Sequence, residues 1–150
     1  MRTHSVVLIF AFLFLIASLA GCSAHTVPPE ERFVIFCNND TATDIAAIQI
    51  DFSLGGDTLG SVVGSYADGT PIKPGDAMDF EFLPEDFPEH ADLSQLQIGL
   101  TVRDMEGSEK TARTPVNIGA AYGEFYQISI TGNAADGYDA QLMEVTYGRE

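Results

Sequence analysis

Oxygen ligands at short spacing occur in two turn-like stretches of the sequence, each built around a glycine. Carboxylate and amide oxygens in such an arrangement are the ligands that Ca²⁺ prefers. Neither stretch has the ligand order of an EF-hand loop. We therefore expect two hairpin turns with solvated carboxylates and predict no metal site. The calcium candidates are Asn133, Asp136 and Asp139, and separately Asp104, Glu106 and Glu109.

Other catalytic patterns are incomplete. Ser94 follows His90 closely, but the Gly-x-Ser-x-Gly elbow that activates a serine is absent. His90, Cys37 and distant carboxylates lack the spacing of a zinc site. The glycine-rich stretch 55–60 has no Gly-Lys-Ser/Thr to hold phosphate, so we interpret it as a loop.

Glycoside hydrolysis needs two carboxyl groups in one cleft. A chain with 22 acidic residues contains many accidental pairs, and it has no tryptophan for stacking on sugars. We expect no catalytic residue, no cofactor and a non-catalytic binding or structural module. A domain that binds or hydrolyses envelope polysaccharide is the alternative from another class.

The net charge of the chain limits the kinds of partner it can bind. The sequence has 22 acidic residues and 7 Lys or Arg, for a formal net charge of −15. A surface this acidic repels phosphate backbones and anionic head groups, so we predict no nucleic-acid partner and no electrostatic binding to lipid. An unknown protein or glycan is the expected partner.

The N-terminus has the layout of a secretory signal. Arg2 precedes an unbroken apolar run of 12 residues, Val6 to Ala17, which is shorter than the roughly 20 residues that span a bilayer. Small residues follow this run and lead to Cys22. We therefore expect residues 1–21 to be removed as a signal peptide.

The stretch Leu19-Ala20-Gly21-Cys22 resembles the lipobox of bacterial lipoproteins. The resemblance implies cleavage between Gly21 and Cys22 and a lipid on the Cys22 thiol, which would anchor the protein to a membrane. Ser23 stands where lipoproteins retained in the inner membrane of enteric-type bacteria usually carry Asp, which favours a cell-envelope location at the outer membrane. With Cys22 lipidated, only Cys37 remains, so no intramolecular disulfide is expected.

The mature chain indicates one domain after a short link. Residues 22–31 contain Pro28-Pro29 and read as a tether that reaches roughly 30 Å at most, and residues 32–150 are enough for a single core. Apolar and polar residues then alternate with period two, which is typical of half-buried antiparallel strands. Turn residues separate the segments. We predict an all-β antiparallel sandwich, with an eight-stranded β-barrel as the alternative, from seven strands near 32–37, 45–53, 78–83, 96–104, 110–118, 124–131 and 140–147.

Three short patterns follow one another across about residues 40–110. Asn39-x-Thr41 opens one strand, Ile72-x-Pro74-Gly75 follows a glycine-rich stretch, and Asp104-x-x-Gly107 ends a later strand. This order resembles a family of small exported bacterial β-sandwich proteins of unknown function. The resemblance implies a fold rather than an activity.

The longest stretch that fits no strand is Leu83–Gln95. It carries Phe87 among prolines and acids, and loops on a rigid scaffold are where binding residues gather. We name Phe87 as the candidate contact with a partner. The competing interpretation is that the Phe87 ring folds back and plugs one end of the sandwich.

Overall fold

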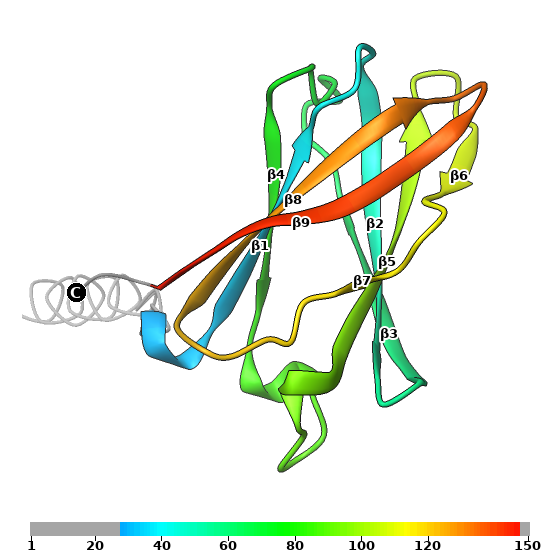
Figure 1. Cartoon of the computed structure of the whole chain (residues 1–150). Helices are drawn as coiled ribbons and strands as arrows, with labels where there is room; N and C mark the ends of the chain where they lie inside the picture. The colour runs from blue at the N-terminus through cyan, green and yellow to red at the C-terminus, as the bar shows by residue number, and fades with distance from the viewer. Residues whose placement is uncertain (1–27, 148–150) are drawn as a thin grey trace, which may run out of the picture.

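The structure is a computed structural model that describes residues 28–147. Two β-sheets face each other across one core and do not close into a barrel (Figure 1). One sheet has the strand order β4-β1-β8-β9, and the other has β3-β2-β5-β6 with β7 paired to β5. The predicted all-β two-sheet fold is confirmed, and the eight-stranded barrel is not formed.

The described residues form nine strands, whereas the sequence predicted seven, and several strands are longer than predicted. Their bounds are β1 Phe33–Asn39, β2 Ile45–Leu54, β3 Asp57–Gly64, β4 Ala77–Phe82, β5 Leu96–Asp104, β6 Glu109–Thr111, β7 Val116–Asn117, β8 Glu124–Asn133 and β9 Gly137–Tyr147. Three single 3₁₀ turns accompany them: η1 Pro29–Glu31, η2 Pro84–Asp86 and η3 Leu93–Gln95. Within residues 28–147, no helix is long and apolar enough to cross a membrane.

Alternation explains why these strands form two layers. β5 buries every second side chain from Leu96 to Val102, and β4 buries every second one from Met78 to Phe82. Side chains one residue apart point to opposite faces of a strand, so each sheet has an apolar inner face and a more polar outer face. The buried side chains of both sheets form one cluster that also takes in Cys37.

The glycine-rich stretch expected to be a loop is partly strand. Gly55 and Gly56, at φ 60° and 98°, make the turn of a hairpin, and β3 begins directly after it at Asp57. β3 pairs only with β2 and most of its side chains are partly or fully exposed. An edge strand without a buried face has no alternation for a sequence pattern to detect.

Two further details differ from the prediction. The expected strand 110–118 is divided into β6 and β7, with Pro115 between them, because proline cannot donate to a strand ladder. β1 pairs parallel with β8, so that Ile35 lies opposite Tyr126, whereas the other strand pairs are antiparallel. Alternation is the same in both pairings and does not reveal strand direction.

Two of the three short sequence patterns meet in one polar corner. The buried Asn39 amide donates to the Ile72 carbonyl (2.8 Å) and the Thr43 carbonyl (3.0 Å), while its oxygen accepts from the Thr41 N–H and hydroxyl. The Gly75 N–H donates to the Asn39 carbonyl. Asn39-x-Thr41 and Ile72-x-Pro74-Gly75 are therefore two halves of one structural joint.

Candidate binding surface

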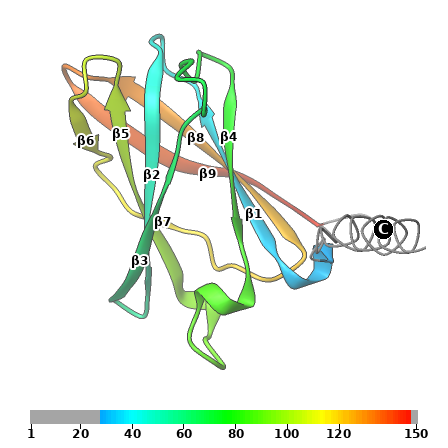
Figure 2. The same ribbon diagram turned by 180° about the vertical axis from the view of Figure 1, so that it is seen from behind.

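One end of the sandwich carries the long connections. The loop Leu83–Gln95, the β2–β3 hairpin and the segment 117–123 all lie there, away from the β5–β6 turn (Figures 1 and 2). The segment 117–123 is held by the Ile118 N–H, which donates to the Leu96 carbonyl, and by the Gly123 N–H, which donates to the Arg32 carbonyl. Segments distant in the sequence are thus fixed side by side.

Carboxylates organise the loop Leu83–Gln95 locally. Asp86 accepts the Leu83 N–H at 2.8 Å, closing the first 3₁₀ turn, which Pro84 begins. Asp92 accepts from the N–H and hydroxyl of Ser94 and from the Gln95 side-chain amide. These hydrogen bonds, led by the one from the Ser94 hydroxyl, hold the pKa of Asp92 below its usual value.

Phe87 anchors this loop to the core. Its side chain is only 7% exposed, and its ring lies 5.8 Å from that of Phe33, 5.9 Å from Phe52 and 6.1 Å from Phe82. Burial of an aromatic side chain stabilises a fold more than exposure to solvent does, which favours the inward position. Of the two interpretations, this inward position is that of the plug at one end of the sandwich. Contact between Phe87 and a partner remains a prediction.

A depression of about 500 Å³ lies over this anchor, and we call it the aromatic depression. Its apolar lining comes from Pro84, Phe87, Pro88, Ala91 and Tyr122. The side chains of Glu85, Glu89 and His90 complete it. The sequence identified this loop as a surface, but it gave no signal for Tyr122, which packing brings in from another segment.

Tyr122 connects the depression to the core. Its ring lies 6.0 Å from that of Phe33, yet the residue remains 36% exposed. Partial burial raises the pKa of the Tyr122 hydroxyl, and the negative charges of Asp86 and Glu85 raise it further. The phenol is therefore neutral at physiological pH and lies in a negative field.

A second depression, of about 450 Å³, is lined in part by η3 and is polar. We call it the amide depression, because the side-chain amides of Gln95, Gln97 and Asn117 line it together with Ser94 and the turn Gly55-Gly56. Amides and hydroxyls both donate and accept hydrogen bonds. Such a lining suits a neutral ligand rich in hydroxyl groups.

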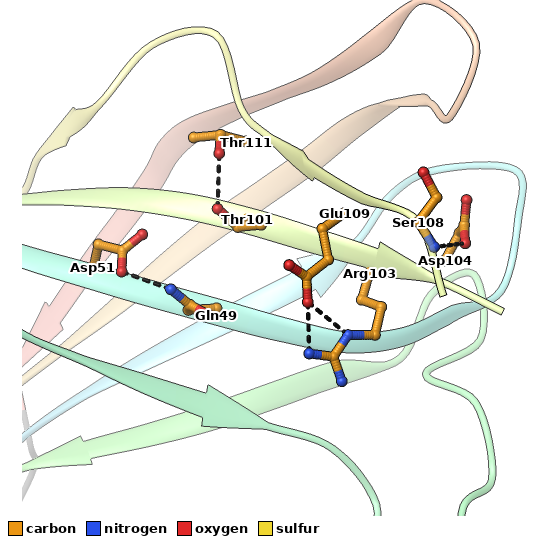
Figure 3. Close-up of polar contacts among 8 residues, drawn as sticks. All are labelled: Gln49, Asp51, Thr101, Arg103, Asp104, Ser108, Glu109 and Thr111. Atoms are coloured by element: carbon orange, nitrogen blue, oxygen red, sulfur yellow. Dashed lines mark hydrogen bonds and ion pairs between the residues drawn. The ribbon is translucent and has the colours of Figure 1, made fainter. Parts of the chain in front are cut away.

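The outer face of the five-stranded sheet is also polar, but its side chains pair with one another (Figure 3). Arg103 donates from Nε and from a terminal nitrogen to one oxygen of Glu109, at 2.8 and 2.6 Å. Thr101 and Thr111 share a hydrogen bond of 2.9 Å, and Gln49 donates to Asp51 at 2.7 Å. These contacts satisfy the groups that a ligand on this face would need.

The calcium candidates serve the hairpin between β8 and β9. The Asn133 side-chain oxygen accepts the N–H groups of Ala135 and Asp136, and the Asn133 amide group donates to the Asp136 carboxylate at 3.0 Å. Asp139 faces Arg113 at 3.9 Å. Over residues 28–147, no group of three or more His, Cys, Asp or Glu side chains gathers as a metal cage would.

The second set of candidate oxygens acts in the same way. Asp104 accepts the N–H groups of Glu106 and Ser108 and so closes the β5–β6 turn, in which Gly107 has φ 85°. Glu109 is bound to Arg103. One carboxylate oxygen of Asp104 and one of Glu109, both calcium candidates from the sequence, therefore already accept hydrogen bonds from protein donors.

The groups considered for catalysis lie apart. The His90 side chain is 91% exposed, with Glu89 3.6 Å away, and the Ser94 hydroxyl donates to Asp92 rather than to His90. Cys37 is buried in the core, where desolvation raises the pKa of its thiol. Gly21 and Cys22, the expected cleavage and lipid sites, lie outside the described residues, as does the proposed signal peptide.

Comparisons with known proteins assign neither a family nor an activity. No family model matches the chain, and no curated protein matches it. A solved chain from the structure of a disulfide-locked mutant of intermedilysin with human CD59 is 13% identical, with a TM-score of 0.34; the match covers 77% of this chain but 24% of that one. A protein from Eubacterium rectale, solved by NMR, is 15% identical, with a TM-score of 0.34 and coverage of 79% and 92%.

Proposed function

We propose that this protein is a lipid-anchored component of the cell envelope, held by Cys22 and acting as a non-catalytic binding module. The support for the anchor is the Leu19-Ala20-Gly21-Cys22 stretch behind an apolar run of signal-peptide length. Ser23 supports the outer membrane as the location. The support for binding comes from the loop-bearing end of the sandwich.

The aromatic depression is the observation that carries the binding role. Phe87 fixes the loop Leu83–Gln95 to the core, so the surface above it is formed before a partner arrives. A preformed surface loses little conformational entropy on association. The outer face of the five-stranded sheet is a weaker candidate, because polar side chains on it already form hydrogen bonds with one another.

Polysaccharide binding is the second candidate, and the amide depression favours it. Gln95, Gln97 and Asn117 offer neutral donors and acceptors without the acidic lining of the aromatic depression. Hydroxyl groups of a sugar pair well with such amides. Loss of binding to isolated envelope polysaccharide in a Gln97→Ala, Asn117→Ala variant, with binding kept in Glu89→Gln, would select this alternative.

Two measurements test the main proposal in cells that make the protein. The first is labelling with a fatty-acid analogue, which should mark the wild type and not Cys22→Ala; an unlabelled wild type refutes the anchor. The second places a photo-crosslinking amino acid at Glu89, beside the aromatic depression, or at Glu106, in the turn at the opposite end. A discrete crosslinked product specific to position 89 supports the binding surface, and identical products at both positions contradict it.

A further inference from the structure

The aromatic depression combines an apolar base with carboxylates that have no Lys or Arg ion pair among the described residues. The loop Leu83–Gln95 contains four carboxylates and no Lys or Arg. Across residues 28–147, the Lys and Arg ion pairs join Arg32 to Glu81, Arg103 to Glu109 and Arg113 to Asp139. Glu85 and Glu89 therefore line the depression with no Lys or Arg partner among the described residues, and the His90 imidazole lies 3.6 Å from Glu89.

Those two carboxylates share the lining of the depression with two aromatic residues, the buried Phe87 and the partly exposed Tyr122. Glu85 is close enough to Tyr122 for its charge to raise the pKa of the Tyr122 hydroxyl. An aromatic face attracts a cation through its quadrupole, and an adjacent carboxylate adds a direct Coulomb attraction. A lysine or arginine side chain can also cover apolar surface with its alkyl stem while its charged group reaches the carboxylates.

We propose that the aromatic depression binds a lysine or arginine side chain carried by a basic peptide segment of a partner protein, with apolar residues flanking that side chain. The inference rests on the proposed function as a binding module and names the chemistry of its ligand. The apolar flanks pack against Pro84, Pro88 and Ala91, and the charged group lies between Glu85, Glu89 and Tyr122.

The same features disfavour other occupants. A hard metal ion needs several oxygens around one point, whereas Pro84, Pro88, Phe87 and Tyr122 make up half of the residues in this lining. Nucleic acid and anionic lipid carry the same sign of charge as the depression. A second copy of this chain would bring a formal charge of −15 to the contact.

A binding assay on the full-length chain in a neutral, non-ionic detergent tests the inference. The probes are three fluorescein-labelled heptapeptides, identical in their apolar residues, in which two positions carry arginine, lysine or glutamine. We expect the arginine and lysine peptides to bind at least about tenfold more tightly than the glutamine peptide, with an affinity that falls as salt is added.

Matched variants separate a specific site from general attraction to an acidic protein. Glu85→Gln with Glu89→Gln should weaken the arginine peptide about tenfold, while two neutralisations at the far end, Glu106→Gln and Glu109→Gln, should change binding less than about twofold. Tyr122→Phe keeps the aromatic face and should bind like the wild type, whereas Tyr122→Ala should bind weakly. A thermal melt of each variant checks its folding.

Several results would overturn the inference. If the glutamine peptide binds as tightly as the arginine peptide, the ligand does not need a cation. If Glu106→Gln with Glu109→Gln weakens the arginine peptide as much as Glu85→Gln with Glu89→Gln does, the attraction comes from net charge alone. Loss of binding in Tyr122→Phe would remove the aromatic face from the argument. Failure of all three peptides, with crosslinks at position 89 still forming in cells, would reject the cationic ligand and leave the proposed binding function standing.

Discussion

The ring of Phe87 lies 5.8 Å from the ring of Phe33, which joins the loop after β4 to the first core strand. This contact makes the loop Leu83–Gln95 part of the folded unit. The surface above Phe87 therefore inherits the rigidity of the core, and stability and binding at this end of the sandwich are linked through one side chain.

Replacement of Phe87 should measure that link. Phe87→Ala should lower the free energy of unfolding by about 3 kcal/mol, because it empties a buried ring position among three other aromatic rings. Phe36, half-buried on the outer face beside Phe125, is the matched control and should lose clearly less on change to Ala. Chemical denaturation gives both values. Equal losses would mean that Phe87 is not a core residue.

The strand register of β5 makes a second prediction. Leu100 is buried and Thr101 faces outward, where its hydroxyl pairs with that of Thr111. Leu100→Ala should cost about 2–5 kcal/mol through the cavity it leaves, and Thr101→Ala under about 1 kcal/mol. Urea unfolding of the two variants decides the register, since a shift by one residue would reverse their order.

The polar corner predicts an unusual pH dependence. Asn39→Asp exchanges an amide that donates to two carbonyls for a carboxyl group that donates only when protonated. Burial and the facing carbonyls should raise the folded-state pKa of the introduced carboxyl above its unfolded value of about 3.9. The variant should therefore be closest to wild type near pH 4 and fall behind as pH rises through the folded-state pKa. Unfolding of both proteins at pH 4 and pH 7 checks this, and an equal deficit at both would contradict it.

Asp92 predicts a pH dependence of stability opposite in sign to that of the Asn39→Asp variant. Hydrogen bonds from Ser94 and Gln95 lower its folded-state pKa below 3.8, so its stabilising effect is complete above 3.8 and is lost as pH falls through the lower folded value. The Ser94 amide signal in an NMR titration should move with a midpoint below pH 3.8. Asp92→Asn should abolish that movement. A midpoint above 3.8 would show that these hydrogen bonds do not form.

The two cysteines allow a count that reports on the anchor. Cys37 is buried and its thiol pKa is raised, so a thiol reagent should leave it unmodified in the folded protein. In denaturant, purified mature protein should show one reactive thiol if Cys22 carries the thioether lipid. Two reactive thiols would mean that Cys22 is free, and none would mean that Cys37 is modified in the cell.

Alternation revealed the core strands because one face of each is buried. It could not reveal β3, an edge strand with little buried surface, or the parallel pairing of β1 with β8. The loop Leu83–Gln95 was visible as the longest break in the pattern, but Tyr122 reaches the aromatic depression through long-range packing of a segment without periodicity. Asn117 reaches the amide depression through the pairing of β7 with β5, and alternation does not reveal which strands pair. Local sequence specifies faces and turns, whereas a site built across segments depends on how the layers stack.

The hydrogen bond from the Gly123 N–H to the Arg32 carbonyl places the start of β1 beside the segment that carries Tyr122. With the lipid on Cys22 that we propose, the six residues up to Pro28 extend at most about 20 Å, so this end of the domain stays near the bilayer. The aromatic depression would then sample a thin layer of solvent at the membrane rather than the bulk. A partner fixed to the same membrane would meet it by lateral diffusion, and a freely diffusing one would have to enter the gap beneath the domain.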